Sequence, residues 1–163
     1  MNLGNTIVIA VISAICIVPF LLMRQNRKKK EKQMLANLAG IANENNCEIN
    51  NHEFCGDFII SEDKNLDFIF FFKQKKEENI LKFVNLNEVK NCSVFKDIKT
   101  FKNGNGNESI IEKVMLNFIA KDKNKPDINF EFYCEENTQL SGEIQLADSW
   151  SKKINNRLKV INN

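Results

Sequence analysis

The residues best suited to metal or thiol chemistry in this chain are five cysteines and one histidine. Cys47, His52 and Cys55 lie close together in the sequence, and thiolates and imidazoles at such spacing can bind zinc. Structural zinc sites usually have a second pair of close ligands, whereas Cys92 and Cys134 each stand alone. We therefore predict no metal and no other cofactor, and we interpret all the cysteines as reduced, unpaired thiols.

Residues for acid–base or nucleophilic catalysis are equally sparse. General acid–base catalysis usually requires a histidine or paired carboxylates in a dry pocket. His52 lies in the polar stretch 50–53, which is typical of a protein surface. The sequence contains no glycine-rich phosphate loop that opens a helix and no nucleophile elbow. We therefore predict that the protein is not an enzyme.

The N-terminal segment points to lipid contact. Residues 7–23 are uncharged, and with Leu3 and Gly4 included the segment is just long enough to cross a hydrocarbon core of roughly 30 Å. Basic residues follow on the C-terminal side only, which favours an outward N-terminus and a cytoplasmic body. We predict that residues 1–23 are an uncleaved transmembrane signal-anchor of a single-pass protein in the inner (plasma) membrane. The competing interpretation is a cleavable signal peptide, which usually has a basic start and small residues at its end.

Two groups of side chains follow from this interpretation. The predicted membrane anchor consists of Ile7, Val8, Ile9, Val11, Ile12, Ile15, Ile17, Val18, Phe20, Leu21 and Leu22. The side chains predicted to meet anionic lipid headgroups are Arg24, Arg27, Lys28, Lys29, Lys30 and Lys32. The whole chain carries +2 and residues 24–32 carry +5, so residues 33–163 carry −3. An acidic body has no basic face to neutralise phosphates, which argues against nucleic acid as a partner.

The elements that must carry these residues are a helix, a series of strands and a second helix. Residues 24–46 are predicted to form a basic juxtamembrane helix with an apolar stripe that includes Leu35, Leu38 and Ile41. Within residues 47–163, strand-like runs cover 58–61, 66–73, 80–86, 89–101, 110–120 and 128–133. Residues 102–108 have the composition of a loop. Apolar residues at helical spacing from Ile144 to Ile161 predict an amphipathic C-terminal helix.

This order of elements resembles that of the pleckstrin-homology-like (PH-like) family, in particular its small membrane-anchored bacterial members. The likeness rests on the strand series 58–101, on the run VNLNEVKNCSVFK that turns a corner between two strands, and on Trp150 in the last helix. The resemblance implies an α+β fold: a bent barrel of six or seven antiparallel strands, closed by the C-terminal helix. The loop 62–65 is acidic overall, so the phosphoinositide site of the family is not carried over.

The aromatic run 68–72 carries the best signal for an interaction. In a strand, Phe68, Phe70 and Phe72 face one way, while Ile69 and Phe71 face the other. One interpretation buries one set in the barrel and the other set under the N-terminal helix. The alternative leaves Ile69 and Phe71 exposed as part of a patch for a partner.

Two functions of different class follow. The first is a membrane-tethered, non-enzymatic adaptor that binds a membrane-proximal protein partner and contacts membrane lipids through its anchor. The alternative is a lipid or small-ligand binding module. A long unpaired edge strand beside exposed aromatic residues would favour the adaptor, and an apolar pocket with a few converging polar groups would favour the ligand module.

Overall fold

Seven antiparallel strands divide into two separate sheets in the computed structural model, which describes residues 3–75, 78–103, 106–135 and 140–162. The side chains of residues 3–10, 14, 102–103 and 106–108 lie outside this description. The first sheet has the order β1-β2-β3-β4 and the second the order β5-β6-β7. The strands are β1 (Ile49–Cys55), β2 (Phe58–Asp63), β3 (Phe68–Lys73), β4 (Ile80–Asn85), β5 (Val89–Asn103), β6 (Gly106–Ala120) and β7 (Ile128–Cys134), with the 3-10 helix η1 (Leu86–Glu88) at the corner between the sheets.

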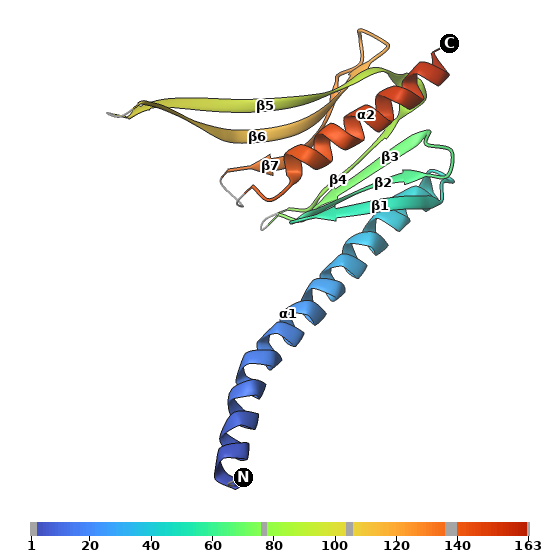
Figure 1. Ribbon diagram of the computed structural model, residues 1–163. Helices are drawn as coiled ribbons and strands as arrows, with labels where there is room; N and C mark the ends of the chain where they lie inside the picture. The colour runs from blue at the N-terminus through green and yellow to red at the C-terminus, as the bar shows by residue number, and fades with distance from the viewer. Residues whose placement is uncertain (1–2, 76–77, 104–105, 136–139, 163) are drawn as a thin grey trace.

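Two helices complete the layers. The long helix α1 (Leu3–Glu44) docks its C-terminal part on the outer face of the first sheet, and α2 (Glu143–Ile161) lies along the opening between the two sheets (Figure 1). Met34, Leu38 and Ala42 of α1 are buried against Ile59 and Phe70. Trp150 and Ile154 of α2 are buried in the core that both sheets share. The first sheet is thus covered on both of its faces.

The alternation of side chains along β3 explains this arrangement. Ile69 and Phe71 enter the core between the sheets, while Phe70 and Phe72 pack under α1. Both sets are apolar, so a strand with two apolar faces must be covered on both. Of the two interpretations of the aromatic run, burial on both faces is confirmed. The predicted partner patch is wrong, because Ile69 and Phe71 are fully buried.

The predicted bent barrel is also wrong, although seven antiparallel strands and a closing helix are present. Closing a barrel requires that an edge strand of one sheet pairs with an edge strand of the other, and no ladder joins the two sheets in the described residues. At the β7 edge, lysine side chains take the place of a strand. Lys73 Nζ donates to the carbonyl oxygen of Glu131 at 3.2 Å, and Lys82 Nζ donates to that of Asn129 at 2.8 Å. Lysines are a common means of blocking strand addition at a sheet edge.

The properties of helix α1 contradict the predicted membrane location. In the part of the chain that the structure describes, no helix combines the length and the apolar character that crossing a membrane requires. The predicted transmembrane signal-anchor and single-pass inner-membrane location are therefore wrong. The predicted orientation, with an outward N-terminus and a cytoplasmic body, depends on that anchor and is wrong with it.

Most predicted strands are found close to their expected bounds. The exceptions are β1, which was not predicted, and the loop 102–108. Strand β5 continues to Asn103 and β6 begins at Gly106, so the hairpin is longer than predicted; residues 104–105 lie outside the described chain. The predicted juxtamembrane helix, expected to continue the preceding helix and to dock on the domain, is the C-terminal part of α1, which runs without a break from Leu3 to Glu44 through Pro19.

Candidate binding edge and adjoining pocket

Strand β5 is an edge strand, and α2 covers only part of its edge. The carboxamide of Asn155 binds the backbone of Cys92 twice: its Oδ1 accepts from Cys92 N at 3.1 Å, and its Nδ2 donates to Cys92 O at 2.6 Å. Ser151 Oγ donates to the same carbonyl at 3.1 Å. These side chains satisfy the backbone groups that a neighbouring strand would otherwise bind.

This contact also shows the backbone phase of β5, that is, which of its residues direct their N–H and C=O groups toward the open edge. Cys92 turns its N–H and C=O away from β6, and these directions alternate along a strand. Val94, Lys96, Ile98 and Thr100 therefore present their backbone groups at the same open edge. The register shift beside Ile98 inserts the extra residue into β6, so the alternation of β5 is kept. Among the described residues, no backbone hydrogen bond reaches this part of β5 from outside the β5–β6 ladder.

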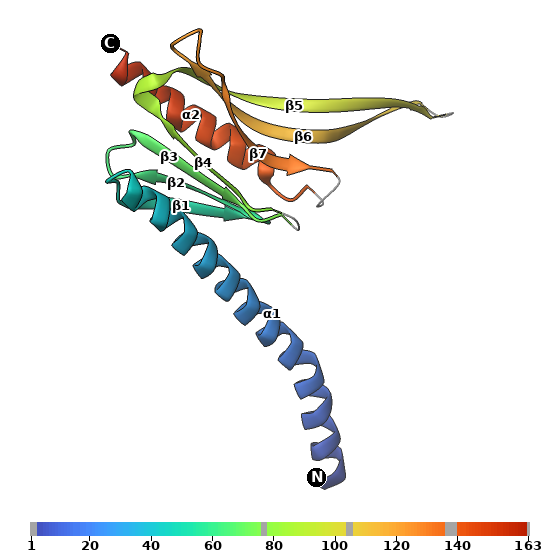
Figure 2. The same cartoon turned by 180° about the vertical axis from the view of Figure 1, so that it is seen from behind.

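Apolar side chains gather on the same part of the hairpin. Phe95, Ile98 and Phe101 of β5 are 48%, 54% and 43% exposed, and Ile110 of β6 is 41% exposed. The distal half of the β5–β6 hairpin projects past α2 and the first sheet, in both views (Figures 1 and 2). A projecting hairpin with exposed aromatic residues is typical of an interaction surface.

Charged side chains accompany these apolar groups. Lys99 pairs with Glu112 on β6 at 2.8 Å, and its ammonium lies 5.4 Å from the centre of the Phe101 ring. Lys96 pairs with Asp148 at the start of α2 at 3.5 Å. In the described residues, Asp97 has no ion-pair partner, although it lies opposite Lys113 in the register with β6. The edge thus offers backbone groups, aromatic rings and one unpaired carboxylate.

A second candidate site is a cavity of about 400 Å³ beside the end of β4. Its walls come from both sheets and are mostly apolar. The lining residues include Phe68, Phe83, Val89, Phe118, Pro126 and Ile128. Glu88 and Lys125 also line it and pair with each other at 2.9 Å. The cavity therefore has little net charge to offer a ligand.

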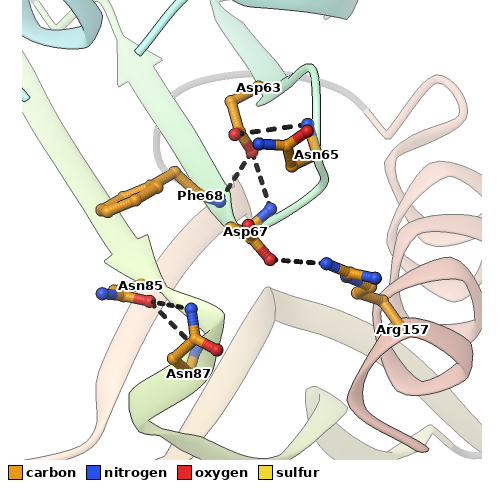
Figure 3. Close-up of polar contacts among 7 residues, drawn as sticks. All are labelled: Asp63, Asn65, Asp67, Phe68, Asn85, Asn87 and Arg157. Carbon is orange, nitrogen blue, oxygen red and sulfur yellow. Dashed lines mark hydrogen bonds and ion pairs between the residues drawn. The ribbon is translucent and has the colours of Figure 1, made fainter. Parts of the chain in front are cut away.

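Side-chain hydrogen bonds fix two turns near this cavity. Asp63 Oδ1 accepts from the backbone N–H groups of Asp67 and Phe68 at 2.7 and 2.8 Å, which fixes the β2–β3 turn (Figure 3). Asn85 Oδ1 accepts from Asn87 N at 2.9 Å. The amide nitrogen of Asn85 points away from Asn87, to the side on which the Phe68 ring lies (Figure 3). It is a hydrogen-bond donor at the wall of an apolar cavity.

Arg157 connects this turn to helix α2. Its Nη2 donates to Asp67 Oδ1 at 2.7 Å, which links α2 to the β2–β3 turn (Figure 3). Lys153, one turn earlier in α2, pairs with the nearly buried Glu62 of β2. The two cations on one face of α2 thus hold the helix on the first sheet.

The residues singled out for metal chemistry do not form a site. His52 is exposed on β1 and packs edge-on against Phe54. Burial raises the pKa of Cys47, and burial together with the Glu143 carboxylate raises that of Cys55 to about 11. Protonated thiols are poor ligands and poor nucleophiles. Among the described residues there is no group of three or more histidines, cysteines and carboxylates suited to hold a metal ion.

The residues predicted to contact lipid lie on α1. Val11, Ile12, Ile15, Ile17, Val18, Phe20, Leu21 and Leu22 are exposed, while the side chains of Ile7, Val8 and Ile9 lie outside the described set. Arg24, Arg27, Lys28, Lys29, Lys30 and Lys32 are exposed as well. Arg27 pairs with Glu31 at 2.9 Å, and Arg27 and Lys30 line a polar cavity of about 650 Å³. These basic residues are thus partly engaged within the chain.

Sequence reasoning missed the residues that make the binding edge. It predicted β5 but not that β5 lies at an edge, and it gave no role to Asn155. One signal was present: after Val94 the apolar residues Phe95, Ile98 and Phe101 no longer keep a period of two. A strand that loses its alternation has left the core.

No family model matches the chain, and the comparisons with curated proteins and with solved structures likewise give no match. The resemblance to the PH-like family therefore stays a prediction.

Proposed function

We propose that this chain is a non-enzymatic adaptor that binds a protein partner by adding an extended segment of that partner to β5. One observation carries the proposal: β5 is a 15-residue edge strand, and the backbone hydrogen bonds that α2 makes with this edge, among the described residues, are at Cys92. Strand addition draws its affinity from main-chain hydrogen bonds and its specificity from side chains on alternate positions.

The side chains beside the open edge fit such a partner. Phe95 and Phe101 lie on one face of the hairpin, and Ile98 lies on the other. An extended segment with apolar residues at alternate positions would cover rings that now lie in water, and aromatic pairs between strands contribute up to about 1 kcal/mol each. The acidic body argues for a protein partner and against nucleic acid.

Site-specific photo-crosslinking tests this proposal. Phe101 is replaced by p-benzoylphenylalanine in the full chain, in the cells that make it, with Asn124 on the β6–β7 turn as the control position. We expect a discrete protein adduct from position 101 and none from position 124. The absence of any adduct from position 101 would overturn the proposal.

A proline variant tests whether the adduct depends on backbone pairing at the β5 edge. Thr100→Pro removes a backbone N–H that faces outward, so the partner loses a hydrogen bond while the ladder with β6 is kept. Thr100→Ala removes the hydroxyl group but keeps that N–H, and is the matched control. We expect Thr100→Pro to abolish the adduct and Thr100→Ala to preserve it; equal adducts would mean that the partner does not use the edge.

The cavity beside β4 supports a second candidate, a module for a small neutral apolar ligand with a hydrogen-bond acceptor. Its volume falls within the range of ligand pockets, about 300–1,000 Å³, and Asn85 Nδ2 is the donor that the acceptor would meet. N-Phenyl-1-naphthylamine, an uncharged apolar fluorophore, is a suitable probe. We expect its emission to rise on binding and Ala120→Trp, which fills the cavity, to abolish the rise. The matched variant Leu81→Trp lies outside the cavity lining and should leave the rise intact; equal binding by both variants would refute this candidate.

A further inference from the structure

We propose that the segment that occupies the β5 edge is the same edge of a second copy of this chain, paired antiparallel about a two-fold axis at Ile98. The inference rests on the proposed strand addition at β5 and names its partner. It is carried by the self-complementary pattern of residues 95–101, by the backbone phase of β5 and by the projection of the hairpin from the rest of the molecule.

The sequence pattern is self-complementary about Ile98. An antiparallel pair with its axis at Ile98 places Phe95 opposite Phe101 of the second copy and Asp97 opposite its Lys99. Each pairing occurs twice, because the contacts of a two-fold interface are reciprocal. Aromatic pairs and opposite charges directly across strands are both stabilising. The carboxylate of Asp97, which has no ion-pair partner among the described residues of its own chain, thereby acquires one.

The backbone phase agrees with the same axis. Ile98 presents its N–H and C=O outward, so the two copies of Ile98 can exchange both hydrogen bonds, and Lys96 can do the same with Thr100 of the second copy. The pairs Phe95 with Phe101 and Asp97 with Lys99 then fall at positions without hydrogen bonds. There the Cα atoms lie about 4.5 Å apart and side chains approach most closely.

Neighbouring registers are less favourable. An axis at Asp97 also pairs the even-numbered residues with one another, but it places the two copies of Asp97 directly opposite each other, and like charges in that position repel. An axis at Lys96 places the two copies of Lys96 directly opposite each other, and like charges in that position repel. The backbone phase permits all three positions, and among them only the axis at Ile98 places no like charges directly opposite each other.

The shape of the molecule permits this approach. The distal half of the hairpin extends past α2 in both views (Figures 1 and 2). Where the start of α2 approaches this part of β5, Asp148 pairs with the side chain of Lys96, and no backbone hydrogen bond from other described residues reaches the open edge. Pairing would join the two three-stranded sheets into one continuous sheet of both chains. The open β5 edge would then be closed, which removes a template for aggregation.

Charge exchange between two variants tests the inference. Asp97→Lys places like charges across its own dimer, and so does Lys99→Asp. In a mixture of the two variants, the lysine introduced at position 97 of one chain meets the aspartate introduced at position 99 of the other, and the unaltered charges at the other end of the interface are also opposite. The assay is the molar mass of the full chain, measured by sedimentation equilibrium in a mild non-ionic detergent that screens the exposed apolar residues 11–23.

The expected results are specific. The unaltered chain should dimerise. Each variant alone should dimerise with an affinity at least about tenfold lower, and an equimolar mixture of the two variants should recover a heterodimer. Because Lys99→Asp also faces Glu112, a second variant combines it with Glu112→Lys, which keeps an ion pair within the hairpin and the same charge at the edge. Far-ultraviolet circular dichroism checks that each variant is folded.

The alternative outcomes separate this inference from the proposed function. A monomeric chain with a Phe101 adduct to a different protein overturns the inference that the partner is a second copy, and it leaves the proposed adaptor function intact. A dimer that is insensitive to Asp97→Lys, to Lys99→Asp and to Thr100→Pro forms through another surface and also overturns the inference. A monomer with no Phe101 adduct overturns both.

Discussion

Replacing Lys73 by methionine should destabilise the protein far more than the same change at Lys82. The Lys73 side chain is 1% exposed and its Nζ contacts the carbonyl oxygen and the carboxylate of Glu131, both at 3.2 Å. Lys82 makes the same kind of bond, to Asn129 O, from an exposed position. Lys73→Met keeps the apolar stem but leaves both acceptors of Glu131 without their buried donor.

The size of the effect follows from these surroundings. Removing one partner of a buried ion pair costs about 3–5 kcal/mol. The Glu131 carboxylate is 20% exposed and keeps Lys75 at 3.0 Å, so we expect the lower end, about 3 kcal/mol. The exposed bond of Lys82 should contribute no more than about 0.5–1 kcal/mol.

Urea unfolding followed by the fluorescence of Trp150, the single and buried tryptophan, measures both variants. With a slope of about 1.5 kcal/mol per molar urea, Lys73→Met should lower the midpoint by about 2 M and Lys82→Met by less than about 0.7 M. Equal shifts, or no shift for Lys73→Met, would refute the reasoning that burial of the lysine sets its contribution at the β7 edge.

Three further predictions concern other contacts. Asn155→Ala should lower the free energy of unfolding by about 1–3 kcal/mol, because Cys92 N loses its partner while Cys92 O keeps Ser151; amide hydrogen exchange at Cys92 should accelerate, and unchanged protection there would contradict the capping role. Leu38→Ala should cost about 2–5 kcal/mol, since this fully buried leucine anchors α1 on the first sheet; a cost below about 1 kcal/mol in urea unfolding would mean that α1 does not dock. Burial alone would raise the pKa of Glu131, but hydrogen bonds and charges from Lys75 and Lys73 lower it below its ordinary value of 4.5. The stability that Glu131 confers is therefore present above pH 4.5 and is lost as the pH falls through its folded-state pKa. Glu131→Gln should be less stable at pH 7 and should lose less stability on acidification between about pH 5 and 3; parallel pH profiles of variant and unaltered chain would exclude this assignment.

Local patterns predicted the elements well, and they predicted their assembly poorly. The alternation in 68–72 correctly indicated a strand covered on both faces, and the spacing of Ala147, Trp150 and Ile154 correctly indicated a helix that enters the core. Strand β1 was missed because Asn50, Asn51 and His52 point to solvent and hide the alternation.

The open edges could not be predicted because they depend on long-range contacts of single polar side chains. Whether a lysine reaches water or a carbonyl oxygen, as Lys73 and Lys82 do at β7, depends on how two sheets pack. The same holds for Asn155, which lies 63 residues from Cys92 in the sequence. The anchor prediction is contradicted because no helix in the described part of the chain is long and apolar enough to cross a membrane.

The order of the strands has a consequence for how the chain folds. Within each sheet every strand pairs with its neighbour in the sequence, so most pairing is local, and low contact order favours fast folding. Each sheet can form as a chain of hairpins without waiting for a distant segment. Helix α2 differs, because its buried face contacts strands from both sheets. We therefore expect its docking to be the late, cooperative step that converts two independently formed hairpin arrays into one folding unit.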